Sequence, residues 1–225
     1  MKGFEYCLFD LDGTLTDPRE GITRSVQYAL RFFGIDEPDL TKLEVFIGPP
    51  LKDSFKEFYG FTDEQAAKAV LFYRERFAPI GILENRIFPE IPLMLSRLKK
   101  RGISLAVASS KPINFVHQIL AHFDIEQYFQ VIVGSELDGA RSAKEEVVAE
   151  ALRQLGVLEL SENERHERCA MTGDRKFDIQ GAKASRLTAV GVSFGFAGPG
   201  ELEEAGAEFI AGTVKDLEAF LLGEC

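Results

Sequence analysis

Cysteine is scarce in this sequence, which has none of the cysteine patterns of disulfide-stapled or zinc-binding proteins. Only three of the 225 residues are cysteine: Cys7, Cys169 and Cys225. Three cysteines cannot all pair with one another, and their spacing matches no zinc motif. Cys7 and Cys169 lie in apolar, strand-like runs, so we predict two buried core thiols, with Cys225 as a frayed terminal one. Free thiols are typical of a reducing compartment.

Long apolar runs and targeting segments are also missing. No apolar stretch reaches the roughly 18 residues of a membrane-spanning helix, and no signal peptide with a cleavage site is present. We therefore predict a cytoplasmic protein with no membrane partner. The three histidines, His117, His122 and His166, lack metal-ligand spacing and are expected to be surface or packing residues.

Positive charge is in deficit. The sequence has 26 lysines and arginines against 36 aspartates and glutamates, which gives a net charge of -10. An acidic surface repels the phosphates of nucleic acids, so we expect no nucleic-acid partner. It also repels small phosphorylated molecules, so a phosphate-binding site would need its own local positive charge. Hydrophobic residues make up 45% of the chain, which is enough for a folded core.

The segment from residue 16 to 87 is predicted to be helical, with no convincing strand. Apolar residues recur at helical spacing over residues 20–33, and Gly34 follows as a natural stop. Two further helices are predicted over residues 51–59 and 63–77, on either side of Gly60. Phenylalanines at helical spacing in this segment are expected to form its core.

The rest of the chain alternates between predicted strands and predicted helices. Strands are expected at residues 4–11, 103–108, 129–133, 168–172 and 188–192, and helices at 91–100, 112–123, 144–155, 177–186 and 217–222. The strands are apolar on both faces, which is typical of a parallel sheet covered by helices on both sides. We therefore predict an α/β protein: a doubly wound parallel sheet (residues 1–15 and 88–225) with an inserted all-helical domain (residues 16–87).

Polar residues follow several of these strands. In a doubly wound sheet, functional groups gather beyond the carboxyl ends of the strands. The residues at these ends are Asp10-Leu11-Asp12-Gly13-Thr14, Ser109-Ser110-Lys111, and Gly173-Asp174 with Asp178, and Lys144 leads a helix after a polar loop.

If these strand ends converge, the four carboxylates of Asp10, Asp12, Asp174 and Asp178 share one small space. Two unit charges 4 Å apart repel by about 4 kcal/mol at an effective dielectric near 20. A hard divalent cation with oxygen ligands relieves this repulsion, and magnesium suits a few carboxylates plus a substrate phosphate. Lys144 can supply a second positive charge.

Such a site suits phosphoryl transfer. A carboxylate beside a bound metal can attack phosphorus and form an aspartyl phosphate. A second carboxylate with a raised pKa, here Asp12, can protonate the leaving oxygen and later activate water. Gly13 permits a sharp turn that lets N–H groups near it, including that of Thr14, face the phosphate. Ser109 and the N–H that follows it, on Ser110, can hold a phosphate oxygen.

These motifs, in this order, resemble the four motifs of haloacid dehalogenase superfamily phosphatases over nearly the whole chain. The helical insert matches the family's cap, which implies substrate selection and closure by the insert, with hinges at residues 16–18 and 85–90. The resemblance implies the following roles: Asp10 as nucleophile and magnesium ligand, Asp12 as acid/base and backbone ligand of the metal, Ser109 as phosphate binder, Lys144 as partner of nucleophile and phosphate, and Asp174 with Asp178 as metal ligands.

Simpler interpretations compete for some of these residues. Asp12-Gly13 can be a plain turn, Ser109 can be a helix N-cap, and Lys144 can be a solvated helix residue beside two glutamates. Lys111 is a rival for the role given to Lys144, because it lies two residues after Ser109. Arg175 is interpreted as a surface charge.

Within the resembled superfamily, Asp12 argues against dehalogenases and phosphonatases. Ile22 and the 48–50 turn stand where sugar-phosphate mutases carry histidine and arginine. The remaining segments look like the phosphoglycolate phosphatase-like branch, part of which is described as 5′-nucleotidases and a smaller part as pyrophosphatases. We predict a hydrolase of a small phosphorylated metabolite, acting as a monomer or homodimer. A non-catalytic phosphate-binding or regulatory protein, a pyrophosphatase and a phosphosugar mutase stay as alternatives.

Overall fold

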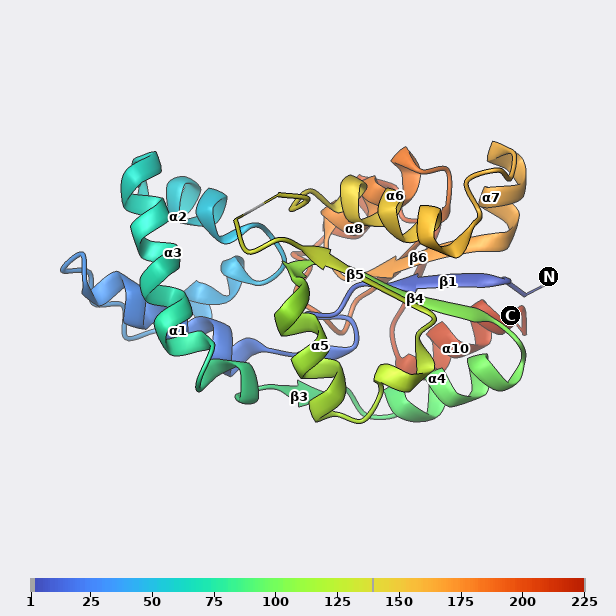
Figure 1. The fold of residues 1–225 in the computed structure, drawn as a ribbon, viewed down its shortest axis with the longest axis horizontal. Helices are drawn as coiled ribbons and strands as arrows, with labels where there is room; N and C mark the ends of the chain where they lie inside the picture. Colours follow the sequence, from blue (N-terminus) through green and yellow to red (C-terminus); the bar gives the residue numbers. More distant parts are fainter. Residues whose placement is uncertain (1–2, 139, 225) are drawn as a thin grey trace. The chain divides into compact units, whose positions relative to one another are not determined.

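The computed structural model describes residues 3–138 and 140–224. The chain packs into two compact units (Figure 1). The core unit comprises Met1–Thr16 and Ile87–Cys225, and the helical unit comprises Asp17–Arg86. The chain passes between them twice, and there the short strands β2 (Thr16–Asp17) and β3 (Arg86–Ile87) pair with each other. The sequence did not predict these two strands, because two residues are too few for an alternating pattern.

A six-stranded sheet forms the centre of the core unit, in the order β5-β4-β1-β6-β7-β8. The strands are β1 (Tyr6–Phe9), β4 (Ser104–Pro112), β5 (Val131–Ser135), β6 (Cys169–Gly173), β7 (Thr188–Val192) and β8 (Phe209–Ala211). Every neighbouring pair is parallel, and Leu8 of β1 lies between Ala106 of β4 and Met171 of β6. Because β1 lies between β4 and β6, the three strand ends with candidate residues are adjacent.

Helices cover both faces of this sheet, which confirms the predicted doubly wound α/β fold. The helices are α4 (Ile91–Lys100), α5 (Ile113–His122), α6 (Lys144–Leu155), α7 (Glu162–Arg168), α8 (Lys176–Ala184), α9 (Glu201–Ala205) and α10 (Val214–Leu222), with the 3-10 turn η3 (Glu126–Tyr128). Figure 1 shows α6 and α8 on one face and α4, α5 and α10 on the other. Apolar residues of β1, β4, β6, α6 and α8 form one continuous buried cluster.

The thiols of Cys7 and Cys169 are both buried, as predicted, and Cys169 belongs to this cluster. Burial raises the pKa of both, that of Cys169 to about 11, so neither ionises near neutrality. Cys225 lies outside the described residues. Within the described part of the chain, no helix is long and apolar enough to cross a bilayer.

The helical unit contains α1 (Arg19–Arg31), α2 (Leu51–Tyr59), α3 (Asp63–Phe77) and the 3-10 turns η1 (Leu40–Phe46) and η2 (Gly81–Leu83). Gly60 ends α2 in the left-handed region at φ +64°, and Thr62 begins α3 with a capping box. Phe55 and Phe77 are fully or almost fully buried, as expected of core residues. The same expectation is wrong for Phe32 and Phe58, which are 50% and 42% exposed.

Candidate active site

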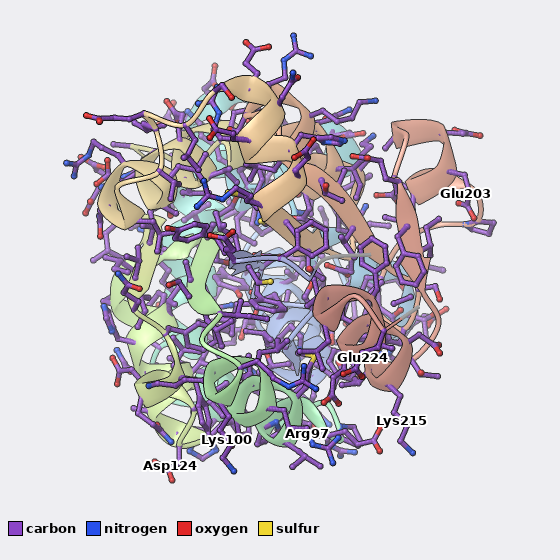
Figure 2. All side chains as sticks on the ribbon, turned by 90° about the vertical axis from the view of Figure 1, so that its right-hand side faces the viewer. Arg97, Lys100, Asp124, Glu203, Lys215 and Glu224 are labelled. Atoms are coloured by element: carbon purple, nitrogen blue, oxygen red, sulfur yellow. The ribbon has the colours of Figure 1, made fainter. Side chains whose placement is uncertain are left out.

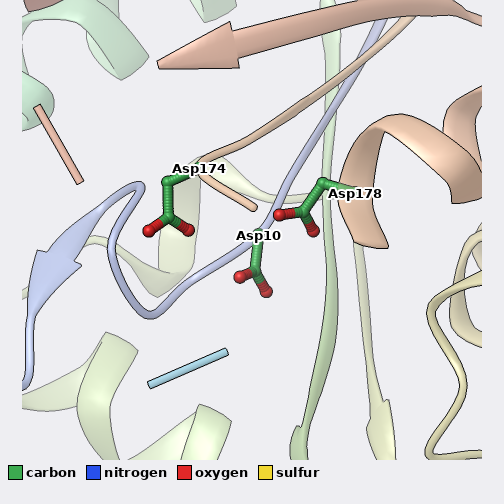
Figure 3. A group of neighbouring side chains, drawn as sticks. All are labelled: Asp10, Asp174 and Asp178. Atoms are coloured by element: carbon green, nitrogen blue, oxygen red, sulfur yellow. The ribbon is translucent and has the colours of Figure 1, made fainter. Parts of the chain in front are cut away.

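Three carboxylates meet beyond the carboxyl edge of the sheet (Figure 3). Asp10 follows β1, Asp174 follows β6, and Asp178 lies in the first turn of α8. Each offers one oxygen, and these oxygens lie within 4.8 Å of one another. All three residues are buried, with at most 4% of their surface exposed. Charges this close repel by about 4 kcal/mol per pair at an effective dielectric near 20, so the group requires positive charge.

Lys144 supplies one such charge. It is the first residue of α6 and is buried, and its Nζ lies 2.8 Å from Oδ1 of both Asp10 and Asp178. The same atom donates to the backbone oxygen of Ala108 at 3.1 Å. Burial lowers the pKa of Lys144, but the two carboxylates outweigh burial and the net pKa is raised, so the ammonium stays charged. Lys144 is therefore not a solvated helix residue.

One lysine does not neutralise three carboxylates. Burial raises the pKa of Asp178 to about 6, although Lys144 opposes the rise. Burial, then Asp178 and Asp10, raise the pKa of Asp174. Only ionised carboxylates make good metal ligands, and a cation bound beside Asp174 and Asp178 would favour their ionised forms.

The three carboxylates fit a hard divalent cation. Oδ1 of Asp174 is buried and has no hydrogen-bond partner among the described residues, whereas Oδ2 accepts from the N–H of Phe196 at 2.7 Å. The absence of a side chain at Gly13 leaves room beside the Asp174 carboxylate, because a Cβ on Gly13 would lie 2.1 Å from Oδ2 of Asp174. An orphaned carboxylate oxygen among other carboxylates matches the oxygen-only donor set of magnesium.

The carboxylate of Asp12 is not among the three whose oxygens lie within 4.8 Å of one another, but it lies close enough to Asp10 for that charge to raise its pKa. It forms an ion pair with Nζ of Lys111, and both side chains are buried. Burial raises the pKa of Asp12, and Lys111 lowers it by a smaller amount. Lys111 and Lys144 are therefore not rivals: Lys144 contacts Asp10 and Asp178, and Lys111 contacts Asp12.

The loop after β1 has a tight turn at Gly13, whose φ is +86°. The N–H of Gly13 donates to Thr16 at 2.7 Å, and that of Thr14 donates to Leu11 at 3.3 Å. These two N–H groups therefore close the loop itself, which differs from the expectation that they face a phosphate. The hydroxyl of Thr14 is buried, and it has no hydrogen-bond partner among the described residues.

Ser109 and Ser110 belong to β4, which continues to Pro112 and so runs four residues beyond the predicted strand. Ser109 is buried, and its Oγ accepts from the N–H of Lys111 at 3.4 Å. It is not the N-cap of α5, because Pro112 holds that position without a side-chain cap. Ser110 is partly buried, and its backbone oxygen accepts from Oγ of Ser135 at 2.8 Å.

Comparison with known proteins places this arrangement in a family. Residues 7–192 match the haloacid dehalogenase-like hydrolases. The chain belongs to that family. Among curated relatives, a 5′-nucleotidase from Pseudomonas aeruginosa is 51% identical over 195 residues, which cover 87% of this chain and 85% of that protein. A phosphoglycolate phosphatase from Aquifex aeolicus is 31% identical over 81% of this chain and 82% of that protein.

Another curated relative has a name of a different kind. The tyrosine-protein kinase PtkA from Mycobacterium tuberculosis is 39% identical over 84% of this chain, and the match spans 62% of that protein. Among solved structures, one described as a predicted phosphatase from Clostridium acetobutylicum matches with a TM-score of 0.93 and 44% identity. It covers 99% of this chain and all of that chain.

This haloacid dehalogenase-like hydrolase has two site contacts that the sequence analysis missed. The N–H of Phe196 reaches Asp174 from the loop after β7, and the flanking Gly195 is the signal that could have indicated it. A Cβ on Gly195 would lie 2.4 Å from Cβ of Asp174. Arg175 is also not the surface charge that we expected, because its side chain is 14% exposed and pairs with Glu201.

Proposed function

We propose that this haloacid dehalogenase-like hydrolase is a magnesium-dependent phosphatase of small phosphomonoesters, with Asp10 as its nucleophile. The observation that carries the proposal is the buried group of Asp10, Asp174 and Asp178 with the ammonium of Lys144 between two of them. A non-catalytic regulatory protein would have no need to keep three buried carboxylates in mutual repulsion.

Magnesium would be held by the carboxylates of Asp10, Asp174 and Asp178 and by the backbone oxygen of Asp12. When bound, it supplies positive charge that offsets the repulsion between the nucleophile and the phosphoryl oxygens. The oxygen of Asp174 that has no hydrogen-bond partner within residues 3–138 and 140–224 supports this assignment. Lys144 adds a fixed charge beside the Asp10 carboxylate.

The reaction has two displacement steps at phosphorus. A carboxylate oxygen of Asp10 attacks phosphorus, the bond to the leaving oxygen breaks, and Asp12 gives its proton to that oxygen. Water then attacks phosphorus and gives a proton to Asp12, and the Asp10–phosphorus bond breaks to release phosphate. The raised pKa of Asp12 supports its role as the proton donor.

The residues around Asp10 would bind the phosphate group of the substrate. The hydroxyl of Ser109 and the N–H of Ser110 would hold one phosphoryl oxygen, with Thr14 and Gly13 shaping the loop beside it. The buried hydroxyl of Thr14, which has no partner in the described part of the chain, supports a second contact. Lys111 would hold the Asp12 carboxylate in place until the leaving oxygen arrives.

We propose nucleoside 5′-monophosphates as the first substrate class to test, because a relative that is 51% identical is named a 5′-nucleotidase. Phosphoglycolate comes second, since the relative with that name is 31% identical. Residues 16–87 would act as the cap that selects between them. A cytoplasmic location and a monomeric or homodimeric state stay predictions.

The test is phosphate release from a panel of nucleoside 5′-monophosphates, phosphoglycolate, sugar phosphates and pyrophosphate, with magnesium or with chelator. Asp10→Asn should lose activity and stay folded, because it removes the nucleophile but keeps its shape. Asp36→Asn is the matched control, since Asp36 has a 76% exposed side chain in the helical unit.

Release from wild type and Asp36→Asn, but not from Asp10→Asn, would support the proposal. Residual activity of Asp10→Asn within tenfold of wild type would contradict the role of the nucleophile. Three results would contradict phosphomonoester hydrolysis as the main activity. They are a preference for pyrophosphate, isomerisation of a sugar phosphate, and transfer of a phosphoryl group from ATP to a tyrosine peptide.

A further inference from the structure

Backbone N–H groups of two loops donate to the carboxylates of Asp174 and Asp178. In the loop after β6, the N–H of Arg175 donates to Oδ2 of Asp178 at 3.0 Å. In the loop after β7, the N–H of Phe196 donates to Oδ2 of Asp174 at 2.7 Å. The orientation of Asp174 therefore depends on a loop that begins on the neighbouring strand, because each of these bonds has its donor fixed by the backbone.

Glu201, the first residue of α9, connects these two loops. Its Oε1 accepts from Nε of Arg175 at 2.9 Å and from the N–H of Lys176 at 2.8 Å. Its Oε2 accepts from the N–H of Gly198 at 3.0 Å. One carboxylate oxygen thus binds Arg175 and the first residue of α8, between Asp174 and Asp178, and the other binds the loop that carries Phe196.

Three features indicate that this contact does more than begin a short helix. The bonds to Arg175 and Lys176 join residues 26 and 25 positions apart, whereas an N-terminal cap needs only local contacts. The side chain of Glu201 is 15% exposed, so water competes weakly for it. Although burial raises the pKa of Glu201, its hydrogen bonds and Arg175 lower the pKa overall, so its carboxylate is ionised. Hydrogen bonds to an ionised acceptor are stronger than hydrogen bonds between neutral groups.

Close packing at the same place leaves little freedom for the second loop. A Cβ on Gly195 would lie 2.4 Å from both Cβ of Asp174 and the backbone oxygen of Gly13. The loop that Glu201 holds is therefore in direct contact with the Asp174 ligand and with the loop after β1. A small shift of the loop after β7 would move the N–H of Phe196 away from Asp174.

We propose that Glu201 is a positioning residue for the divalent-metal site, which it stabilises by holding residues 174–178, which lead from β6 into α8, against the loop of residues 195–198. This inference rests on the proposed magnesium site. Glu201 does not touch the cation or the substrate; it acts through the N–H groups of Phe196 and Arg175. Partners of metal ligands typically contribute about 10- to 100-fold to metal affinity.

The experiment compares Glu201→Ala with Glu203→Ala in the full-length chain. Glu203 lies on the same helix, carries the same charge and is exposed, as Figure 2 shows at the edge of the molecule. The dissociation constant of magnesium is measured by titration calorimetry, and the thermal midpoint is measured in chelator. We expect Glu201→Ala to bind magnesium about tenfold more weakly than wild type. Glu203→Ala should stay within about twofold of wild type, since substitutions at exposed positions away from a buried contact usually have small effects.

Each outcome separates the inference from the proposed function. Weaker magnesium binding by folded Glu201→Ala, with kcat restored at saturating magnesium, supports the positioning role. A lower thermal midpoint in chelator with an unchanged magnesium dissociation constant overturns it, because Glu201 would then be structural only. Failure of wild type itself to bind magnesium would instead overturn the proposed function.

Glu201→Gln decides the question if Glu201→Ala does not fold. Glutamine keeps the length of the side chain and one acceptor oxygen, but its amide nitrogen cannot accept from the second loop. Its magnesium dissociation constant should therefore lie between those of wild type and a variant with no acceptor. Wild-type affinity in Glu201→Gln would contradict the inference.

Discussion

The Nζ of Lys144 lies 2.8 Å from Oδ1 of Asp10, the proposed nucleophile. The same Nζ reaches Asp178, so one ammonium serves two carboxylates. Lys144→Met should destabilise the metal-free protein by about 3 kcal/mol, because breaking a buried ion pair leaves its partner charge uncompensated. Urea unfolding in chelator measures this change, with Lys100→Met on the exposed face of α4 as control.

The same variant should also lower kcat by about 10²-fold or more, as for the loss of one fixed group that stabilises charge in a transition state. Saturating magnesium should not restore the rate. Activity of Lys144→Met close to that of Lys100→Met would show that the ion pair has a structural role alone.

The contact between Lys111 and Asp12 leads to a test based on the leaving group. If Lys111 positions Asp12 as the proton donor, Lys111→Met should slow hydrolysis of alkyl phosphates much more than hydrolysis of p-nitrophenyl phosphate. The nitrophenolate leaves without a proton, whereas general acid catalysis contributes about 10²- to 10⁴-fold for a poor leaving group. Lys111→Arg should restore part of the difference, and an equal loss on both substrates would exclude this role.

The contribution of Asp178 to the stability of the metal-free protein should fall as the pH rises from about 4 to about 6. The pKa of Asp178 is raised by burial to about 6 in the folded protein, against about 3.9 in an unfolded chain. For a carboxyl group with a raised pKa, the folded state is favoured while the group is protonated and loses this advantage as it ionises. Unfolding free energies of wild type and Asp178→Asn in chelator isolate the effect, because the variant lacks the titrating group.

Wild type should therefore fall in stability relative to Asp178→Asn across this pH range, and magnesium should reduce the fall. A difference between the two proteins that does not vary with pH would contradict the assigned direction of the pKa shift.

Gly13 should tolerate no side chain. Its φ of +86° disfavours other residues, and a Cβ would lie 2.1 Å from Oδ2 of Asp174. Gly60 offers a matched comparison, with φ +64° and nothing within 4 Å of a Cβ. Gly60→Ala should cost about 1 kcal/mol, the strain of a left-handed residue. Gly13→Ala should cost more and should abolish stabilisation by magnesium, as measured by thermal unfolding. Equal behaviour of the two variants would show that the contact with Asp174 is unimportant.

Much of the fold was predictable because strong local patterns agreed with the final packing. The amphipathic helices α2, α3, α4 and α6 and the strand β7 have the predicted bounds, since each is set off by glycine, proline or a polar turn. Helices α7 and α9 and strand β8 were missed. The sequence of α7 is polar throughout, and the other two are five and three residues long, too short for periodicity.

The part of the candidate site that depends only on charged residues and on strand order was predictable from the sequence. Asp10, Asp174 and Asp178 follow adjacent parallel strands, so their meeting follows from strand order. The partner of Asp12 was not predictable, because it depends on the continuation of β4 to Pro112, which places Lys111 beside Asp12. The role of Glu201 was not predictable either, since it depends on how two loops distant in sequence pack.

The central claim is that Asp10 carries a phosphoryl group during turnover. Asp12→Asn with p-nitrophenyl phosphate tests it most directly, because the first step then needs no proton donor while the second lacks its base. The account predicts a rapid burst of nitrophenolate equal to one equivalent of active sites, followed by slow turnover. Acid-quenched protein should then carry one phosphoryl group on the peptide that contains Asp10. Steady release without a burst, or a phosphoryl group on another residue, would contradict the account.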